Sequence, residues 1–158
     1  MADLLVKLYD LPPSAAQPDP QLPGTIRRAF AAERRLICDW VATAFGSGWA
    51  SECEAAFARS PATCFIARDA YELVGFACYD ATAPGMFGPM GVRPQDRKRG
   101  FGRALLLASL HDMSVRGYAY AVIGGASSLK FYQQAAGATE IPDSTPGFYR
   151  GMLRLRGT

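Results

Sequence analysis

The sequence lacks several features that would place it in other classes of protein. No apolar run approaches the roughly 20 residues that a membrane-spanning helix needs. Its start, Met1-Ala2-Asp3, lacks the basic residues and the long apolar stretch of a signal peptide. These absences predict a cytoplasmic protein without a membrane partner. The length of 158 residues, with no internal repeat or linker, predicts a single domain over residues 1–158.

Cysteine and histidine are scarce, which argues against several kinds of catalytic site. The four cysteines, Cys38, Cys53, Cys64 and Cys78, form no C-x-x-C pair, and His111 is the only histidine. Metal sites usually bring their ligands in close pairs with histidines nearby. We therefore interpret the cysteines as small core residues, expect no metal ligands, and expect turnover to need neither metal nor thiol.

The net charge of +3 comes from basic residues that gather in two segments, at 27–35 and at 93–103. In the second segment, five basic side chains accompany one acid, Asp96. Such a cluster suits a small polyanion, whereas a nucleic-acid surface normally needs a broader basic stripe. Neither segment interleaves aromatic residues with its charges in the way that single-strand binding favours. No nucleic-acid partner is expected.

Hydrophobic periodicity predicts an α/β fold with a mixed, partly antiparallel central sheet flanked by helices. The second and third strands are spaced as an antiparallel hairpin, and the later strand–helix–strand units imply parallel pairing. Strands are expected at residues 4–9, 64–68, 73–79, 86–92, 119–123, 138–141 and 150–155, and helices at residues 25–45, 51–59, 100–116 and 127–136.

Two local patterns refine this outline. Residues 51–54, Ser-Glu-Cys-Glu, match the S-x-x-E capping box, which predicts that a helix starts at Ser51. The strand at 86–92 contains Gly88, Pro89 and Gly91. Glycine and proline inside a strand indicate an edge, a bulge or a place where a ligand approaches the backbone.

The segment after that strand carries the clearest chemical signal. A basic loop, residues 97–99, leads into Gly100-Phe101-Gly102 and an amphipathic helix. Helix starts leave backbone N–H groups unpaired and carry partial positive charge, and glycines allow a phosphate to approach them. These features predict a pyrophosphate ligand. Nucleoside-triphosphate and dinucleotide loops fit less well, because G-x-x-x-x-G-K-[ST] is absent and Leu105 replaces the third glycine of G-x-G-x-x-G.

The run V-x-P-x-x-R-x-x-G-x-G-x-x-L-L, which begins at Val92, resembles the GNAT acyltransferase superfamily. The R-x-x-G-x-G/A signature of that family matches residues 97–102. A second segment, residues 130–138, resembles the later F-Y-x-x-x-G-[FA] helix of the family, with one extra residue before the glycine. The resemblance covers about residues 64–149. It implies a GNAT-like acyl-CoA N-acyltransferase fold and acetyl-CoA, or a close acyl-CoA, as cofactor.

The resemblance also implies which residues bind acetyl-CoA. The pantetheine arm would meet the backbone of Met90, Gly91 and Val92. Tyr132 would be the general acid that protonates the departing CoA thiolate. The pyrophosphate would be held by the loop and helix start, namely Arg97, Lys98, Arg99, Gly100, Phe101, Gly102 and Arg103.

The chain departs from the family pattern at two places. Gly125 stands where members often have an asparagine, so hydrogen bonds made there would be absent or supplied by Ser127 or Ser128. Many members place a glutamate on the strand before the glycine loop as general base, but residues 86–92 contain no acid. The general base is therefore unassigned.

The resemblance implies an N-acetyltransferase that moves acetyl from acetyl-CoA to a primary amine of a small molecule or peptide by direct attack, alone or as a homodimer. An acyl-CoA-binding sensor with weak or no turnover is the alternative, because the strand acid is missing. The acceptor pocket would come from the first two helices and the strand ends. Trp40, Trp49, Glu52 and Glu54 fall there, but core packing and helix capping explain them at least as well, and the sequence does not identify the amine.

Overall fold

The computed structural model describes residues 1–13 and 25–154. Its centre is a seven-stranded sheet in the order β2-β3-β4-β5-β6-β1-β7. The strands are β1 (Leu4–Lys7), β2 (Thr25–Arg28), β3 (Cys64–Asp69), β4 (Glu72–Tyr79), β5 (Met86–Val92), β6 (Tyr120–Ile123) and β7 (Thr139–Glu140). The α-helices of the described residues are α1 (Arg34–Phe45), α2 (Ser47–Phe57), α3 (Phe101–Val115) and α4 (Leu129–Ala136). No helix within these residues has the length and apolar character to cross a bilayer.

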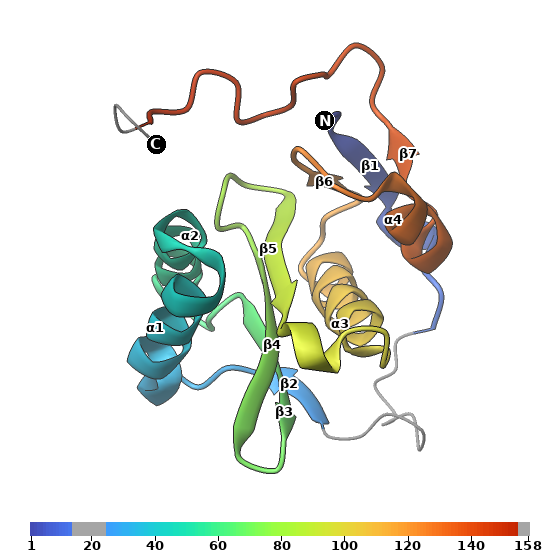
Figure 1. The fold of residues 1–158 in the computed structure, drawn as a ribbon. Coiled ribbons are helices and arrows are strands. Elements are labelled where there is room, and N and C mark those ends of the chain that lie inside the picture. Colours follow the sequence, from blue (N-terminus) through green and yellow to red (C-terminus); the bar gives the residue numbers. More distant parts are fainter. Residues whose placement is uncertain (14–24, 155–158) are drawn as a thin grey trace.

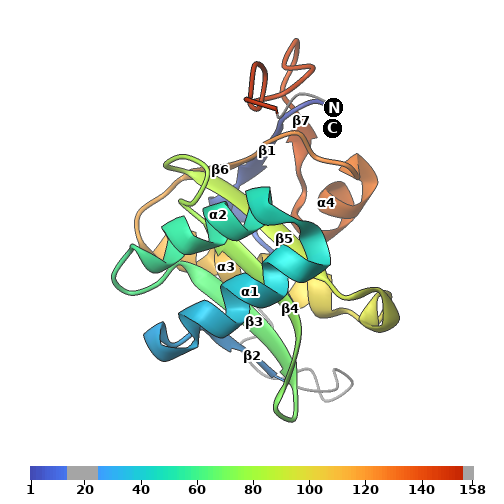
Figure 2. The same ribbon diagram turned by 60° about the vertical axis from the view of Figure 1, so that its left-hand side comes forward.

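The helices cover both faces of the sheet. Helices α1 and α2 lie on one face, and α3 lies on the other (Figures 1 and 2). Each face buries its own apolar core. Aliphatic side chains of α3, such as Leu106 and Leu110, dominate the α3 core, whereas Phe76 and the four cysteines belong to the α1–α2 core. The predicted α/β class and mixed sheet are therefore confirmed.

Strands β5 and β6 pair over a short distance and then separate. Their parallel register contains only Met86 opposite Val122 and Phe87 opposite Ile123. Beyond them, Gly88 has a φ of +120°, which favours glycine, and the register between β4 and β5 shifts next to it. The bulge and the predicted parallel pairing of β5 with β6 are present. The later unit gives no parallel pair, because β1 lies between β6 and β7. The edge of β5 that faces β6 is consequently unpaired after Phe87.

The expected helix over residues 25–45 is wrong in its first part. Residues Thr25–Arg28 form β2, which pairs antiparallel with β3, and α1 begins only at Arg34. The chain turns between them because Arg27 donates two hydrogen bonds to the Glu33 carboxylate, at 2.8 and 2.7 Å. Glu33 in turn accepts the N–H of Phe30. A tertiary pairing partner thus overrides the helical spacing of the apolar residues.

Two other expectations about element boundaries are also wrong. Helix α2 begins at Ser47, so Ser51 is an interior residue whose hydroxyl donates to the Ser47 carbonyl at 3.0 Å. A left-handed Gly46, with φ +100°, separates α1 from α2. Residues 150–154 form no strand, because successive turns continue there, including Met152 N–H to Tyr149 C=O at 3.0 Å. Leu155 lies outside the described residues.

Candidate functional site

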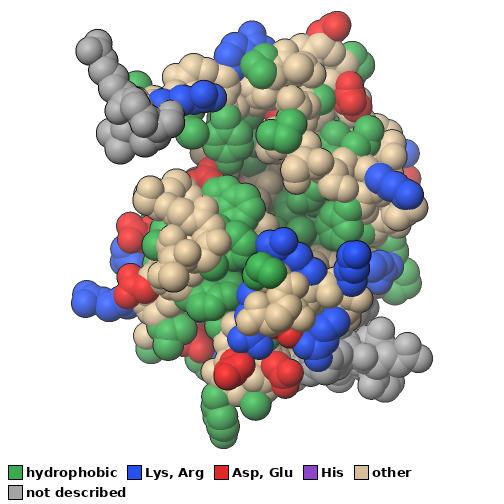
Figure 3. Space-filling model, in the orientation of Figure 1, with side chains coloured by type: hydrophobic (Ala, Val, Ile, Leu, Met, Phe, Trp, Pro, Cys, Tyr) green, Lys and Arg blue, Asp and Glu red, His purple; other side chains and the backbone are tan. Residues whose placement is uncertain are grey.

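A cleft of about 490 Å³ opens where β5 and β6 separate. One wall is β5 from Phe87 to Met90, and the other is the loop that follows β6, residues 124–127. Helix α2 and the aromatic side chains of Tyr132 and Tyr149 complete the lining. Hydrophobic side chains surround this hollow, and Lys and Arg side chains gather beside it over the loop before α3 (Figure 3).

The open edge of β5 presents backbone groups to this space. Arg93 N–H donates to the Val74 carbonyl at 2.9 Å, so Arg93 faces β4. Because the partners in an antiparallel ladder alternate, Gly91 also faces β4, and Met90 and Val92 direct their N–H and C=O groups to the opposite side. The guanidinium of Arg97 already donates to the Val92 carbonyl at 3.0 Å.

Gly91 is glycine because of packing against α1, and not because of the bulge or the ligand approach that the sequence suggested. A Cβ built there would lie 2.5 Å from the ring of Phe45 on α1. Phe45 stacks in turn against Phe76, with ring centroids 5.8 Å apart. The absence of a side chain at Gly91 therefore lets the end of α1 pack directly on the strand whose other edge is open to the cleft.

Helix α3 starts at Phe101 without a side-chain cap. Gly100 precedes it in the left-handed region, with φ +92°, and accepts the first helical hydrogen bond from Ala104. The N–H groups of the first turn are thus free to bind an anion. A Cβ at Gly102 would meet only Phe131 at 3.7 Å and Val92 at 4.0 Å, which are ordinary contacts. Phe101 is 1% exposed, so its ring belongs to the core and only its backbone faces the turn.

The basic loop is held in shape by one buried acid. Asp96 is 3% exposed and pairs with both Arg93 and Arg99. The hydrogen bond from Arg93 lowers the pKa of the Asp96 carboxyl. Among the described residues, Lys98 and Arg103 form no ion pair with any acid, so their charges are available at the helix start.

Tyr132 lies on the cleft in the first turn of α4. Its ring packs against Phe131 and Phe87, with centroid separations of 5.0 and 6.4 Å. Burial raises the pKa of its phenol to about 12, so the hydroxyl carries its proton at neutral pH. The structure thus places the expected acid on the same cleft as Met90, whereas its role as acid stays a prediction.

The sequence interpretation missed an acid that faces the cleft from α2. Glu52 is the one charged side chain among the described residues that line it. Its Oε1 accepts hydrogen bonds from Thr82 and Tyr149, both at 2.7 Å. No described residue donates to its Oε2. Burial, the larger cause, and the bond to Glu52 raise the pKa of Tyr149 to about 12, so Tyr149 stays a donor.

A sequence signal for Glu52 existed but was weak. Residues Trp49, Cys53 and Ala56 follow helical spacing, and Glu52 interrupts their apolar face. The apparent capping box at Ser51 led us to interpret Glu52 and Glu54 as residues of a helix start. Tyr149 and Thr82 carry no local pattern, because they meet Glu52 from distant loops.

Gly125, where the resemblance led us to look for an asparagine, is held by Asp3, the residue just before β1. Asp3 Oδ1 accepts the N–H of Gly125 at 2.8 Å and the N–H of Phe148 at 2.9 Å. Asp3 therefore ties the loop after β6 to the segment that carries Tyr149. Of the two expected substitutes, Ser128 caps α4 by accepting the Phe131 N–H at 3.3 Å, and Ser127 lines the cleft.

Comparison with known protein families gives one match. The profile of the "Acetyltransferase (GNAT) family" matches residues 34–138, which include α1 through α4. This span contains β5, the glycine loop and Tyr132, and it contains Glu52 as well. Among curated proteins, no sequence matches this chain.

Several solved structures share the fold. A GCN5-related glucosamine N-acetyltransferase region of a fungal multi-domain β-N-acetylglucosaminidase superposes with a TM-score of 0.71 at 15% identity, covering 89% of this chain and 19% of that one. A GCN5-related N-acetyltransferase from Sphaerobacter thermophilus gives 0.68 at 20% identity, covering 89% and 48%. One from Kribbella flavida gives 0.58 at 17% identity, covering 88% and 53%. This chain therefore spans about a fifth to a half of the length of these structures.

Proposed function

The chain belongs to the Acetyltransferase (GNAT) family, and we propose that it transfers the acetyl group of acetyl-CoA to a primary amine of a small molecule or peptide. The observation that carries the proposal is the cleft itself. An open strand edge, an uncapped helix start, a protonated phenol and a carboxylate with one free oxygen all border or adjoin it.

The residues present fit acetyl-CoA. The first turn of α3 offers unpaired N–H groups, and the space over Gly102 is wide enough that a Cβ there would make only ordinary protein contacts. The pyrophosphate would bind there, with Lys98, Arg103 and the other basic side chains of residues 97–103 supplying charge. The pantetheine arm would follow the open edge of β5, where Met90 and Val92 direct their backbone groups. When bound, acetyl-CoA supplies a thioester whose carbonyl carbon an amine can attack.

Glu52 is the general base of this proposal. Thr82 and Tyr149 both donate to Oε1, which orients the carboxylate and leaves Oε2 to take the proton that the attacking amine loses. A base on α2 would replace the missing acid of β5. It also removes the reason to prefer a sensor without turnover, since the cleft has a proton acceptor.

Tyr132 is the general acid. Because burial raises its pKa to about 12, the phenol stays protonated at neutral pH. The phenol oxygen would supply the proton that the sulfur takes up as the carbon–sulfur bond breaks. Since a thiolate is already a fair leaving group, the expected contribution lies at the low end for positioned proton transfer.

The lining favours an acceptor with one amine and an apolar body. Glu52 supplies the only charged side chain in the described lining, and it would attract an ammonium group before deprotonation. Trp49 and Met152 surround it with apolar surface. No Lys or Arg side chain of the described residues lines the cleft to bind a polyanionic acceptor.

The test is a screen of primary amines and short peptides with acetyl-CoA, read by release of free thiol and by the mass of the acceptor. The expected result is acetylated product from an amine with an apolar body, and its absence when the acceptor is omitted. Tight acetyl-CoA binding without product from any amine would favour the sensor alternative instead.

A further inference from the structure

The four cysteines of the chain converge on one point of the fold, although they are scattered in the sequence. They come from four elements: Cys38 from α1, Cys53 from α2, Cys64 from β3 and Cys78 from β4. The sulfur atoms of Cys53, Cys64 and Cys78 all lie within 4.8 Å of one another. Cys38 belongs to the same core, but its sulfur lies outside this group of three. No described residue forms a disulfide, and all four are buried.

The sheet brings two of these sulfurs together by register. Cys64 is directly opposite Cys78 in the β3–β4 ladder. The neighbouring pair is hydrogen-bonded, since Tyr79 N–H donates to the Thr63 carbonyl at 3.0 Å. Cys64 and Cys78 therefore form a non-hydrogen-bonded pair, in which side chains lie closest. Both point to the α1–α2 face, and Cys53 meets them from the helix layer.

This spacing suits a metal ion that prefers sulfur. With metal–sulfur bonds of about 2.3 Å, a tetrahedral site separates its sulfurs by about 3.8 Å and a trigonal site by about 4.0 Å. Three sulfurs within 4.8 Å of one another reach either geometry by small rotations. Val41, Ala56 and Phe76 of the same core offer no oxygen or nitrogen ligand. Such a site selects soft cations over Mg²⁺ or Ca²⁺.

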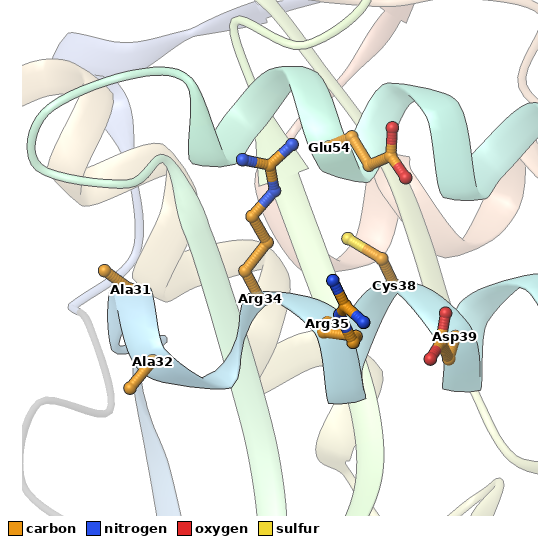
Figure 4. A pocket seen from close by; sticks show the side chains of 7 residues that line it. All are labelled: Ala31, Ala32, Arg34, Arg35, Cys38, Asp39 and Glu54. Carbon is orange, nitrogen blue, oxygen red and sulfur yellow. The ribbon is translucent and has the colours of Figure 1, made fainter.

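A pocket on the molecular surface reaches Cys38, whereas Cys53, Cys64 and Cys78 are fully buried. Cys38 lines an open pocket of about 620 Å³ on the outer surface of α1 and α2. Its sulfur lies between the two helices, with Arg34 and Arg35 on one side and Glu54 on the other (Figure 4). This pocket is separate from the acetyl-transfer cleft, because the two share no lining residue.

We propose that Cys53, Cys64 and Cys78 bind one thiophilic cation, Zn²⁺ or Cu⁺, and that Cys38, whose sulfur lies outside this group, moves in as the fourth ligand when the ion is tetrahedral Zn²⁺. Each ligating thiol releases one proton to water as its metal–sulfur bond forms, and no oxidant is required. The ion would cross-link α2 to strands β3 and β4. It takes no part in acetyl transfer and stabilises the layer that carries Glu52.

The experiment uses the reduced full-length chain, loaded separately with Zn²⁺ and with Cu⁺ and then freed of unbound metal. Metal content by mass spectrometry should be one ion per chain, and the loaded protein should melt at a higher temperature and protect at least three thiols from alkylation. The Cys38→Ala variant separates the two ions: Zn²⁺ affinity should fall at least tenfold, whereas trigonal Cu⁺ binding should stay within about threefold.

Cys64→Ser should lose both ions. The matched control is Val41→Ala, which removes a side chain from the same core without removing a ligand, and which should bind metal as the unchanged chain does. If a variant fails to fold, the metal content, melting temperature and thiol protection of the unchanged chain decide whether the site exists. Absence of stoichiometric metal, equal retention by Cys64→Ser, or a metal-free Cys64–Cys78 disulfide as the stable form would overturn the proposal.

Discussion

The face of the sheet under α3 and the face under α1 and α2 are built from different chemistry. The α3 face has an aliphatic core, and its binding features are backbone groups at the helix start and strand edge, with Asp96 holding the basic loop. The α1–α2 face has an aromatic and sulfur core, and its site chemistry comes from side chains such as Glu52. The α3 face thus suits the CoA part shared by all acyl donors, and the α2 side suits a particular acceptor.

This difference between the two faces predicts that substitutions on the α3 face cause the largest loss of acetyl-CoA affinity. A Gly102→Glu substitution puts a carboxylate where the pyrophosphate would bind, at the positive end of α3. We expect the Kd for acetyl-CoA, measured by calorimetry, to rise at least roughly 100-fold, or about 2.7 kcal/mol. The fold should persist, because a Cβ at Gly102 makes only ordinary contacts.

The matched control is Val115→Glu, which adds the same charge at the exposed far end of α3. It should leave the Kd within about twofold. Unchanged acetyl-CoA affinity in a folded Gly102→Glu protein would contradict the assignment of the pyrophosphate site.

On the α2 side, Glu52→Gln should lower kcat by about 100-fold, because an amide keeps the shape but cannot take a proton at neutral pH. The Kd for acetyl-CoA should not change, since Glu52 meets the acceptor and not the loop. Glu54→Gln is the control: Glu54 lies two residues away and lines the other pocket. Equal kcat values in the two variants would remove Glu52 as the base.

The two faces also differ in how far the sequence predicted them. The glycine loop, β5 and α3 follow from local patterns, because a helix start that binds phosphate needs glycines and charge in consecutive positions. Met90, Gly91, Val92 and the segment at 97–103 were expected to bind acetyl-CoA, which stays a prediction. The structure places Val92 next to Gly102 in the uncapped first turn of α3.

The α1–α2 side depends on contacts between distant segments. Glu52 meets Tyr149, 97 residues away, and Thr82 on a third segment. No pattern of neighbouring residues predicts contacts between segments that are so far apart in the sequence. The cysteines, spaced widely along the chain, meet only because two strands and two helices face one another. Likewise, β1 lies between β6 and β7, an order that no local pattern predicts.

Tyr132→Phe should have a smaller effect than Glu52→Gln, a fall in kcat of about tenfold, because the departing thiolate needs only modest help. The Kd for acetyl-CoA should stay nearly normal, since the ring contacts with Phe131 and Phe87 remain. An unchanged kcat would assign Tyr132 to packing alone.

The raised pKa of Tyr132 adds a dependence on pH. The phenol ionises near 10 in an unfolded chain and at about 12 in the folded one. Its neutral form therefore favours the folded state below pH 10, and this contribution is lost as the pH rises from 10 towards 12. Unfolding by urea at pH 9 and at pH 11.5 should show a loss of stability that is smaller in Tyr132→Phe.

The smallest effect on catalysis should come from the cysteine cluster. A chelator that removes a bound cation from the unchanged chain should lower Tm but leave kcat per folded molecule within about twofold, because neither Glu52, Tyr132 nor the glycine loop contacts a cysteine sulfur. Cys64→Ala should behave in the same way, with the further cost of a small cavity in the core.

Activity would be measured well below the melting temperature, and the folded fraction would be measured by circular dichroism. Abolished turnover in a chelated or Cys64→Ala protein that is still folded would mean that the cysteine cluster takes part in the chemistry itself. The assignment of a purely structural role to the cluster would then be wrong. A loss in proportion to the unfolded fraction fits the structural role, since it shows that the cluster supports the helix layer and leaves proton transfer to Glu52.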